Sequence, residues 1–71
     1  MKILTEDLLH EYGFMNNPNR SSTLVKVMSR NDFDVSIKVD GIYYSNLGFY
    51  YPLRDTATLR KVYTEVKNEE L

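Results

Sequence analysis

The residues able to do acid–base chemistry in this 71-residue chain lie near its start. His10 is the single histidine, and Asp7 precedes it by three residues, within reach of a local hydrogen bond. A general base needs a nucleophile or a substrate beside it, and the sequence around His10 supplies neither. We therefore expect His10 to be a solvated surface histidine on the flank of a helix, beside the solvated carboxylates of Glu6, Asp7 and Glu11.

Other patterns that would support catalysis or metal binding are missing from the sequence. The chain has no cysteine, which excludes disulfides, thiolate metal sites and cysteine nucleophiles. Asp32, Asp34 and Asp40 lack the dense spacing and the closing glutamate of a calcium loop. Gly41 and Gly48 belong to turns rather than to a phosphate-binding loop, and no serine lies in a glycine-flanked elbow. We therefore expect a protein that is not an enzyme, with no catalytic residue, metal, cofactor or small-molecule substrate.

Tyrosine is the residue type here that is most suited to binding a partner. Residues 42–52 hold five of the chain's nine aromatic residues, four tyrosines and one phenylalanine, more rings than a small domain easily buries. Tyrosine is enriched at interfaces because it supplies a large contact area at low entropic cost. The predicted partner-binding residues are Tyr43, Tyr50 and Tyr51, with Arg60 at the rim. The alternative is that most of these rings pack under the C-terminal helix with their hydroxyls reaching water.

A nucleic-acid-binding accessory protein is the second hypothesis. In it, the tyrosines stack on bases while Arg54, Arg60 and Lys61 contact phosphates. Nine Lys and Arg residues against ten Asp and Glu residues give a net charge of −1, whereas nucleic-acid binders carry a basic excess or a basic stripe. The alternative is that these three residues belong to a solvated helix face. Nucleic acid is thus the less favoured partner, and a protein or a second copy of this chain is the expected one.

Two amphipathic helices are predicted, one near each end of the chain. The first covers residues 5–12, with Thr5 as a suitable N-cap and Gly13 at the position where a left-handed residue ends a helix. The last begins at residue 55 or 56 and ends at residue 67, with Asp55 as the N-cap. Its apolar stripe has helical spacing and consists of Leu59, Val62, Tyr63 and Val66.

Three antiparallel strands are predicted between the helices, over residues 23–29, 33–39 and 42–45. The middle strand alternates strictly, which is typical of a sheet with one wet face. Asp40-Gly41 indicates a hairpin with a type I′ turn, and the sequence leaves open whether another strand forms around Phe49. The prediction is therefore an α+β fold, a three-stranded antiparallel meander with both helices on one face. The helices would cover the apolar face formed by Phe33, Val35, Ile37 and Val39.

Length and hydropathy set the expected class and location. The whole chain, residues 1–71, is expected to form one small domain, whose core supplies only about 3–5 kcal/mol of net stability. Self-association is the most available further source of stability, which favours a homodimer. No apolar run approaches the ~20 residues of a membrane span, and the first residues do not resemble a secretory signal. We therefore expect a cytoplasmic protein with no membrane partner.

Short motifs at both ends resemble a family of small uncharacterised bacterial proteins that are often found near mobile elements. The C-terminal motifs are Pro52-Leu53, Leu59, Val62-Tyr63, Val66 and Glu69-Glu70-Leu71. The N-terminal ones are Thr5, Glu6, Gly13 and Phe14, followed by the tyrosine-rich middle. The chain departs from the family in having Arg60 and Lys61 where a Gln-Asn pair is usual. The resemblance implies a fold and a length, and no established activity.

Overall fold

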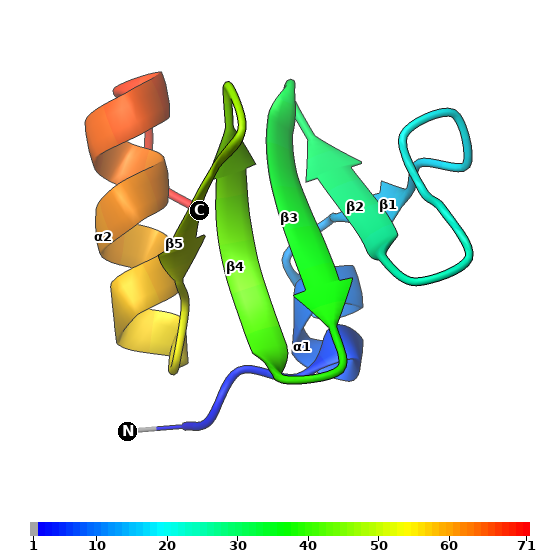
Figure 1. Cartoon of the computed structure of the whole chain (residues 1–71). Coiled ribbons are helices and arrows are strands. Elements are labelled where there is room, and N and C mark those ends of the chain that lie inside the picture. The colour runs from blue at the N-terminus through cyan, green and yellow to red at the C-terminus, as the bar shows by residue number, and fades with distance from the viewer. Residues whose placement is uncertain (1) are drawn as a thin grey trace.

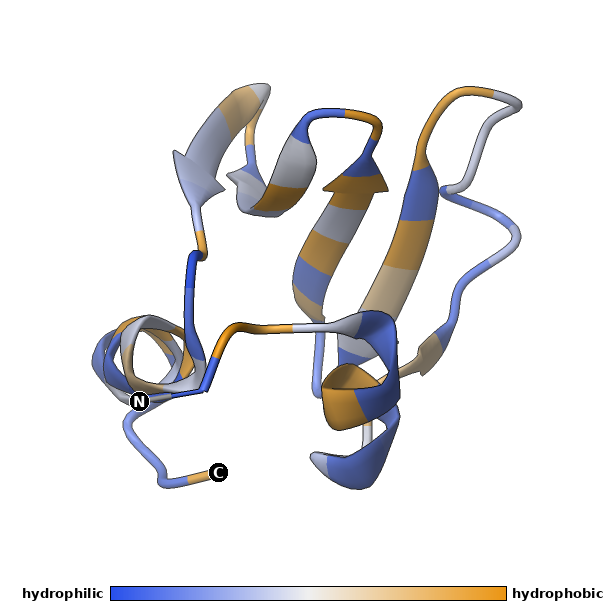
Figure 2. Ribbon diagram, turned by 90° about the horizontal axis from the view of Figure 1, so that it is seen from below, coloured by the Kyte–Doolittle hydropathy of each residue, from blue (hydrophilic) through white to orange (hydrophobic). Residues whose placement is uncertain are grey.

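The fold is a five-stranded antiparallel sheet with two helices, and the computed structural model describes it over residues 2–71. The strands lie in the sheet in the order in which they occur in the chain. Both helices lie on one face of the sheet, and no described helix covers the other (Figures 1 and 2). The elements are α1 (Glu6–Glu11), β1 (Met15–Asn16), β2 (Lys26–Arg30), β3 (Phe33–Lys38), β4 (Gly41–Asn46), β5 (Phe49–Pro52) and α2 (Thr56–Lys67).

The α+β class is confirmed, but the predicted three-stranded meander understates the sheet. Two strands are added, β1 beside β2 and β5 beside β4. β1 has only two residues, too few for an alternating pattern to show in the sequence. The question left open around Phe49 is answered by β5, whose four residues pair antiparallel with β4. The first predicted strand was placed at residues 23–29, whereas β2 covers Lys26–Arg30.

The hairpin predicted at Asp40-Gly41 is present, but its turn is not of type I′. Lys38 pairs with Gly41, so the central residues of the turn are Val39 and Asp40. Neither has a positive φ, which a type I′ turn requires at both central positions. Val39 therefore leaves the sheet at the turn and is fully exposed, at 101%. Its predicted place on the apolar sheet face is wrong for this reason.

Two other hairpins have positive φ at both central residues. Asn31 and Asp32 have φ values of 52° and 63° between β2 and β3, and Leu47 and Gly48 have values of 49° and 84° between β4 and β5. Each turn has two residues, and such loops fix the register of the strands they join. The Leu47-Gly48 turn therefore determines which rings of β4 and β5 share a face.

Both helices begin as predicted. The Thr5 hydroxyl accepts a hydrogen bond from the Leu8 N–H at 3.2 Å, and Gly13 follows α1 with a φ of 89°. The Asp55 carboxylate accepts a hydrogen bond from the Thr58 N–H at 2.7 Å at the start of α2. These caps satisfy N–H groups that have no partner within the helix.

The core lies between the helices and the sheet and is centred on aromatic rings. The Phe33 ring stacks on Tyr44 at 4.3 Å between centroids, lies 5.0 Å from Tyr63 and meets Phe14 edge-on at 6.0 Å. Leu59 and Tyr63 of the predicted α2 stripe are fully buried, whereas Val66 is 46% exposed. The buried hydrophobic residues of this cluster are Leu4, Leu9, Phe14, Met28, Phe33, Val35, Leu53, Leu59 and Tyr63.

Candidate functional site

The β4–β5 hairpin carries the tyrosine-rich segment, and its register divides the rings between the two faces of the sheet. Tyr44 pairs with Tyr51, so both side chains point toward the face that the helices cover, as does that of Phe49 two residues before Tyr51. Tyr43 and Tyr50 alternate with these residues and point to the opposite face, here called the helix-free face. The Tyr51 side chain therefore points to the face opposite Tyr43 and Tyr50, although Tyr50 and Tyr51 both line one groove at the edge of the sheet.

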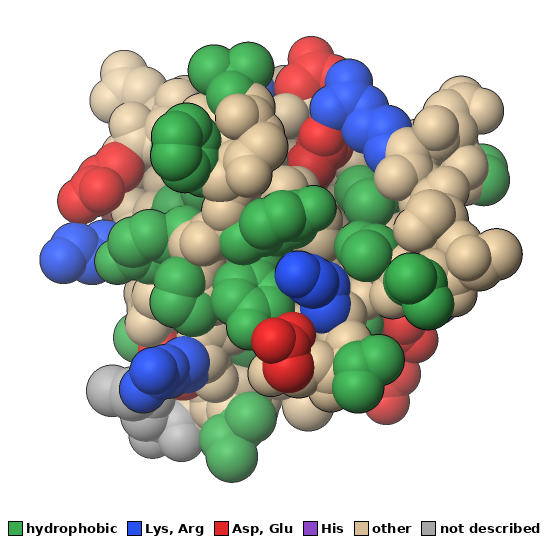
Figure 3. Space-filling view, viewed as in Figure 1, with side chains coloured by type: hydrophobic (Ala, Val, Ile, Leu, Met, Phe, Trp, Pro, Cys, Tyr) green, Lys and Arg blue, Asp and Glu red, His purple; other side chains and the backbone are tan. Residues whose placement is uncertain are grey.

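On the helix-free face, Tyr43 and Tyr50 form a pair with a cation beside it. Their rings meet edge to face with centroids 6.0 Å apart. The Lys38 ammonium lies 4.5 Å from the Tyr50 centroid and 5.5 Å from the Tyr43 centroid. Burial, and then the charge of nearby Asp40, raise the pKa of the Tyr43 hydroxyl above its ordinary value. Figure 3 shows hydrophobic side chains gathered across the middle of this face.

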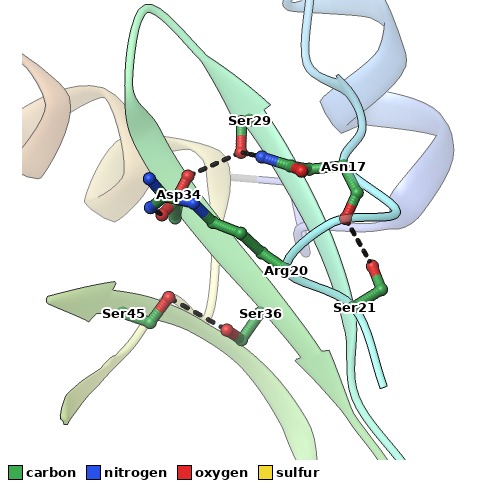
Figure 4. A network of polar contacts seen from close by, with 7 residues as sticks. All are labelled: Asn17, Arg20, Ser21, Ser29, Asp34, Ser36 and Ser45. Atoms are coloured by element: carbon green, nitrogen blue, oxygen red, sulfur yellow. Dashed lines mark hydrogen bonds and ion pairs between the residues drawn. The ribbon is translucent and has the colours of Figure 1, made fainter. Parts of the chain in front are cut away.

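A polar network occupies another part of the helix-free face (Figure 4). The Ser29 hydroxyl donates a hydrogen bond to Asp34 at 2.6 Å and accepts one from the Asn17 amide at 3.1 Å. Arg20 forms an ion pair with the same Asp34 carboxylate. Among the described residues, no buried side-chain nitrogen or oxygen lacks a hydrogen-bond partner. The network therefore fastens the segment after β1 to the sheet.

On the helix side, a groove of about 420 Å³ lies between β5 and α2. Its lining residues are Tyr44, Asn46, Phe49, Tyr50, Tyr51, Val62 and Glu65. Phe49 is 79% exposed and Tyr51 is 56% exposed, so two large rings of the groove meet solvent. Leu47 at the tip of the hairpin is 90% exposed. We call this feature the helix-side groove.

The predicted basic residues lie apart from the tyrosine pair, with one exception. Arg60 and Lys61 line a different hollow on α2, together with the carboxylates of Glu65 and Glu70. Arg54 is the exception, because it lines a hollow with Tyr43 where β4 begins. The structure thus brings Arg54 to one tyrosine but brings neither Arg60 nor Lys61 to the Tyr43–Tyr50 pair.

The histidine considered for acid–base chemistry lies on the surface of the molecule. His10 is exposed in the last turn of α1. Within the described part of the chain, no three histidine, aspartate or glutamate side chains are grouped as a metal site would need. Neither helix within those residues has the length and apolar character that crossing a membrane would take.

Comparisons of this chain with protein-family models, with curated proteins and with solved structures found no match. The resemblance to mobile-element-associated proteins therefore stays a prediction.

Sequence reasoning missed three residues that shape these surfaces, namely Lys38, Phe49 and Glu65. The strict alternation of residues 33–38 was a usable signal for Lys38, because it places that side chain on the face opposite Phe33. Phe49 and Glu65 line one groove because β5 lies beside α2. No signal in the sequence predicted that groove, since a strand around Phe49 was left open.

Proposed function

We propose that this protein is a non-enzymatic interaction module that binds a protein partner through the β4–β5 hairpin. The observation that carries the proposal is the exposure of consecutive rings on β5, with Phe49 at 79%, Tyr50 at 48% and Tyr51 at 56%. If a fully exposed aromatic side chain offers about 150–250 Å², these fractions leave on the order of 300–450 Å² of aromatic residue surface. A standard interface buries about 800 Å² per partner, so the rings could form its centre.

The backbone conformation of Leu47 is a second observation in favour of binding through this hairpin. Its φ of 49° is a left-handed conformation, which costs a bulky residue about 1–2 kcal/mol relative to glycine. The side chain is 90% exposed, so no intramolecular packing compensates for this cost. An apolar residue held in such a position at a hairpin tip favours a role in contact with a partner.

The form of contact we propose is between side chains rather than by addition of a strand. In a two-residue hairpin the backbone groups of the residues that flank the turn hydrogen-bond to each other. The backbone groups of Phe49 and Tyr51 therefore bond to β4, while those of Tyr50 and Pro52 point to the free edge of the sheet. Proline has no N–H to donate, and the strand is only four residues long. The free edge of β5 is therefore a poor template for a sixth strand, and a partner would contact the rings instead.

Binding of nucleic acid is the second outcome to test, and the charges favour it less. Lys38 lies against both tyrosine rings of the helix-free face, so an incoming base would have to displace it. Arg60 and Lys61 share their hollow with Glu65 and Glu70, which balances its charge. A phosphate backbone would find one arginine, Arg54, beside Tyr43.

The proposal is tested by comparing matched substitutions at two exposed apolar positions. Phe49→Ser removes a ring from the hairpin, whereas Leu24→Ser makes a similar change at a residue that is 79% exposed outside it. We expect Phe49→Ser, but not Leu24→Ser, to reduce crosslinked partner capture from the native host by at least ten-fold. Sedimentation of the purified chain up to millimolar concentration shows whether that partner is a second copy. Equal capture by both variants would contradict the proposal, and salt-sensitive binding of single-stranded DNA or RNA would replace it with the second hypothesis.

A further inference from the structure

We propose that the helix-side groove binds an organic cation, namely an alkylammonium or guanidinium group. If the cation is a basic side chain of the protein partner, this inference rests on the proposed function. If the cation is a free quaternary ammonium compound, the inference is independent of the proposed function. The argument uses the arrangement of the rings, the one carboxylate beside them, and the cations that the chain already places on its other rings.

The rings form one wall of the groove. Tyr44 and Tyr51 are direct cross-strand partners, and Phe49 lies two residues from Tyr51 on the same face of β5. Directly opposed side chains start about 5 Å apart, and same-face neighbours along a strand start about 6.7 Å apart. Three rings at this spacing can present faces or edges to a group the size of a methylated ammonium. Aromatic cages recognise such cations through the negative potential of the ring faces.

The opposite wall is α2, which adds a carboxylate. Val62 and Glu65 line the groove from this helix. Within residues 2–71, the Glu65 side chain takes part in no salt bridge and no side-chain hydrogen bond. No lysine or arginine lines the groove, although Glu65 also lines the neighbouring hollow of α2 that holds Arg60 and Lys61. An unpaired carboxylate beside an apolar aromatic wall complements a cation that is itself largely apolar, because rings and charge act on the same group.

Other tyrosine rings of this chain have a cation of the chain itself lying over them. Lys38 lies over the Tyr43 and Tyr50 rings of the helix-free face, and the Arg30 guanidinium lies 5.5 Å from the centroid of the Tyr63 ring in the core. Among the described residues, no such cation lies over Tyr44, Phe49 or Tyr51. Of the four rings that line the groove, Tyr50 therefore has the Lys38 cation beside it, whereas Tyr44, Phe49 and Tyr51 have none and share the groove with the Glu65 carboxylate.

The test is a titration of the isotope-labelled chain followed by amide chemical shifts. One probe is choline, and its matched control is 3,3-dimethylbutan-1-ol, which has the same shape and no charge. A third probe is Nα-acetyl-arginine methylamide, which represents the side chain of a peptide. We expect choline or the arginine derivative to bind with a millimolar dissociation constant and to shift the amides of residues 49–51 and 62–65. The stronger of the two identifies the source of the cation.

Two pairs of variants make the result specific. Loss of one unit charge about 4 Å away in water predicts that Glu65→Gln weakens binding roughly five-fold. Glu11→Gln changes the net charge equally on exposed α1 and should leave the affinity unchanged. Tyr51→Leu should abolish the shifts, whereas Tyr43→Leu on the helix-free face should preserve them.

The inference is overturned if the neutral alcohol binds as well as choline, or if Glu65→Gln and Glu11→Gln have equal effects. It is also overturned if no cation binds. In either event, loss of partner capture in Phe49→Ser would still support the proposed function. Cation binding without any effect of Phe49→Ser on partner capture would instead support the cation site alone.

Discussion

Replacing Phe33 by leucine tests whether the aromatic cluster is the centre of this fold. Phe33 is fully buried and contacts three other rings, those of Phe14, Tyr44 and Tyr63. Leucine keeps the position apolar and removes the ring, so the change isolates ring packing from simple loss of hydrophobicity. Phe49→Leu is the matched control, because it makes the same chemical change at a residue that is 79% exposed.

The expected magnitude follows from the three ring contacts. Each aromatic pair contributes about 0.5–1.5 kcal/mol beyond the area it buries, and a smaller side chain leaves a cavity that relaxes only partly. The Phe33→Leu variant should therefore lose roughly 2–3 kcal/mol of unfolding free energy. A domain of this size has only about 3–5 kcal/mol, so the variant should be close to its stability limit.

Urea unfolding followed by far-ultraviolet circular dichroism measures the effect. With a slope of about 1 kcal/mol per molar urea for a small protein, the midpoint should fall by roughly 2 M in Phe33→Leu. Phe49→Leu should change the unfolding free energy by less than about 0.5 kcal/mol. A loss below that same limit in Phe33→Leu, or equal losses in the two variants, would refute the placement of the ring cluster at the centre of the core.

Three further predictions concern the C-terminal contact, the hairpin tip and the segment after β1. The Tyr63 hydroxyl donates a hydrogen bond to Glu69 at 2.6 Å; burial raises the pKa of Tyr63, and this hydrogen bond lowers the pKa of Glu69. The contribution of Tyr63 to the unfolding free energy is complete below pH 10 and is lost as pH rises through its raised pKa. The contribution of Glu69 is complete above pH 4.5 and is lost as pH falls through its lowered pKa. Tyr63→Phe should make the unfolding free energy depend less on pH in both acid and alkali. Urea midpoints at pH 3, 7 and 10.5 measure this, and the same pH dependence in the variant would refute it. Leu47→Asn should relieve left-handed strain and raise the unfolding free energy by about 1 kcal/mol while weakening partner capture, and a lower urea midpoint would argue against strain at that residue. Asp34→Asn removes the carboxylate that holds Arg20 and should cost about 1 kcal/mol and speed proteolytic cleavage within residues 17–25, whereas an unchanged cleavage rate would show that the network does not fasten this segment.

The parts of the fold that local signals determine were predictable from the sequence. Thr5 and Asp55 were expected as N-caps, and both accept the hydrogen bonds that begin their helices. The alternation of residues 33–38 predicted β3, since a side-chain period of two does not depend on distant contacts. These signals are local because capping and pleating act over a few residues.

The remaining parts depend on register and on contacts between elements. β5 was left open because Gly48 and Pro52 interrupt the apolar pattern, although the turn before it fixes the pairing. Without that register, Tyr50 and Tyr51 could not be assigned to opposite faces. The placement of Arg60 away from both tyrosine surfaces likewise depends on where α2 packs, which no periodicity within the helix determines.

The order of the strands also bears on how quickly the chain folds. Each strand pairs with its neighbour in the sequence, so every ladder closes a short loop. Chains dominated by such nearby pairings reach the native state sooner than sheets whose strands must find distant partners. The two ends are joined by α2, by the Ile3–Asp55 bridge and by backbone hydrogen bonds from Leu4 to Arg54 and from Thr56 to Lys2. Acquisition of the native state should therefore be limited by the docking of the last helix onto a sheet that has already formed from successive hairpins.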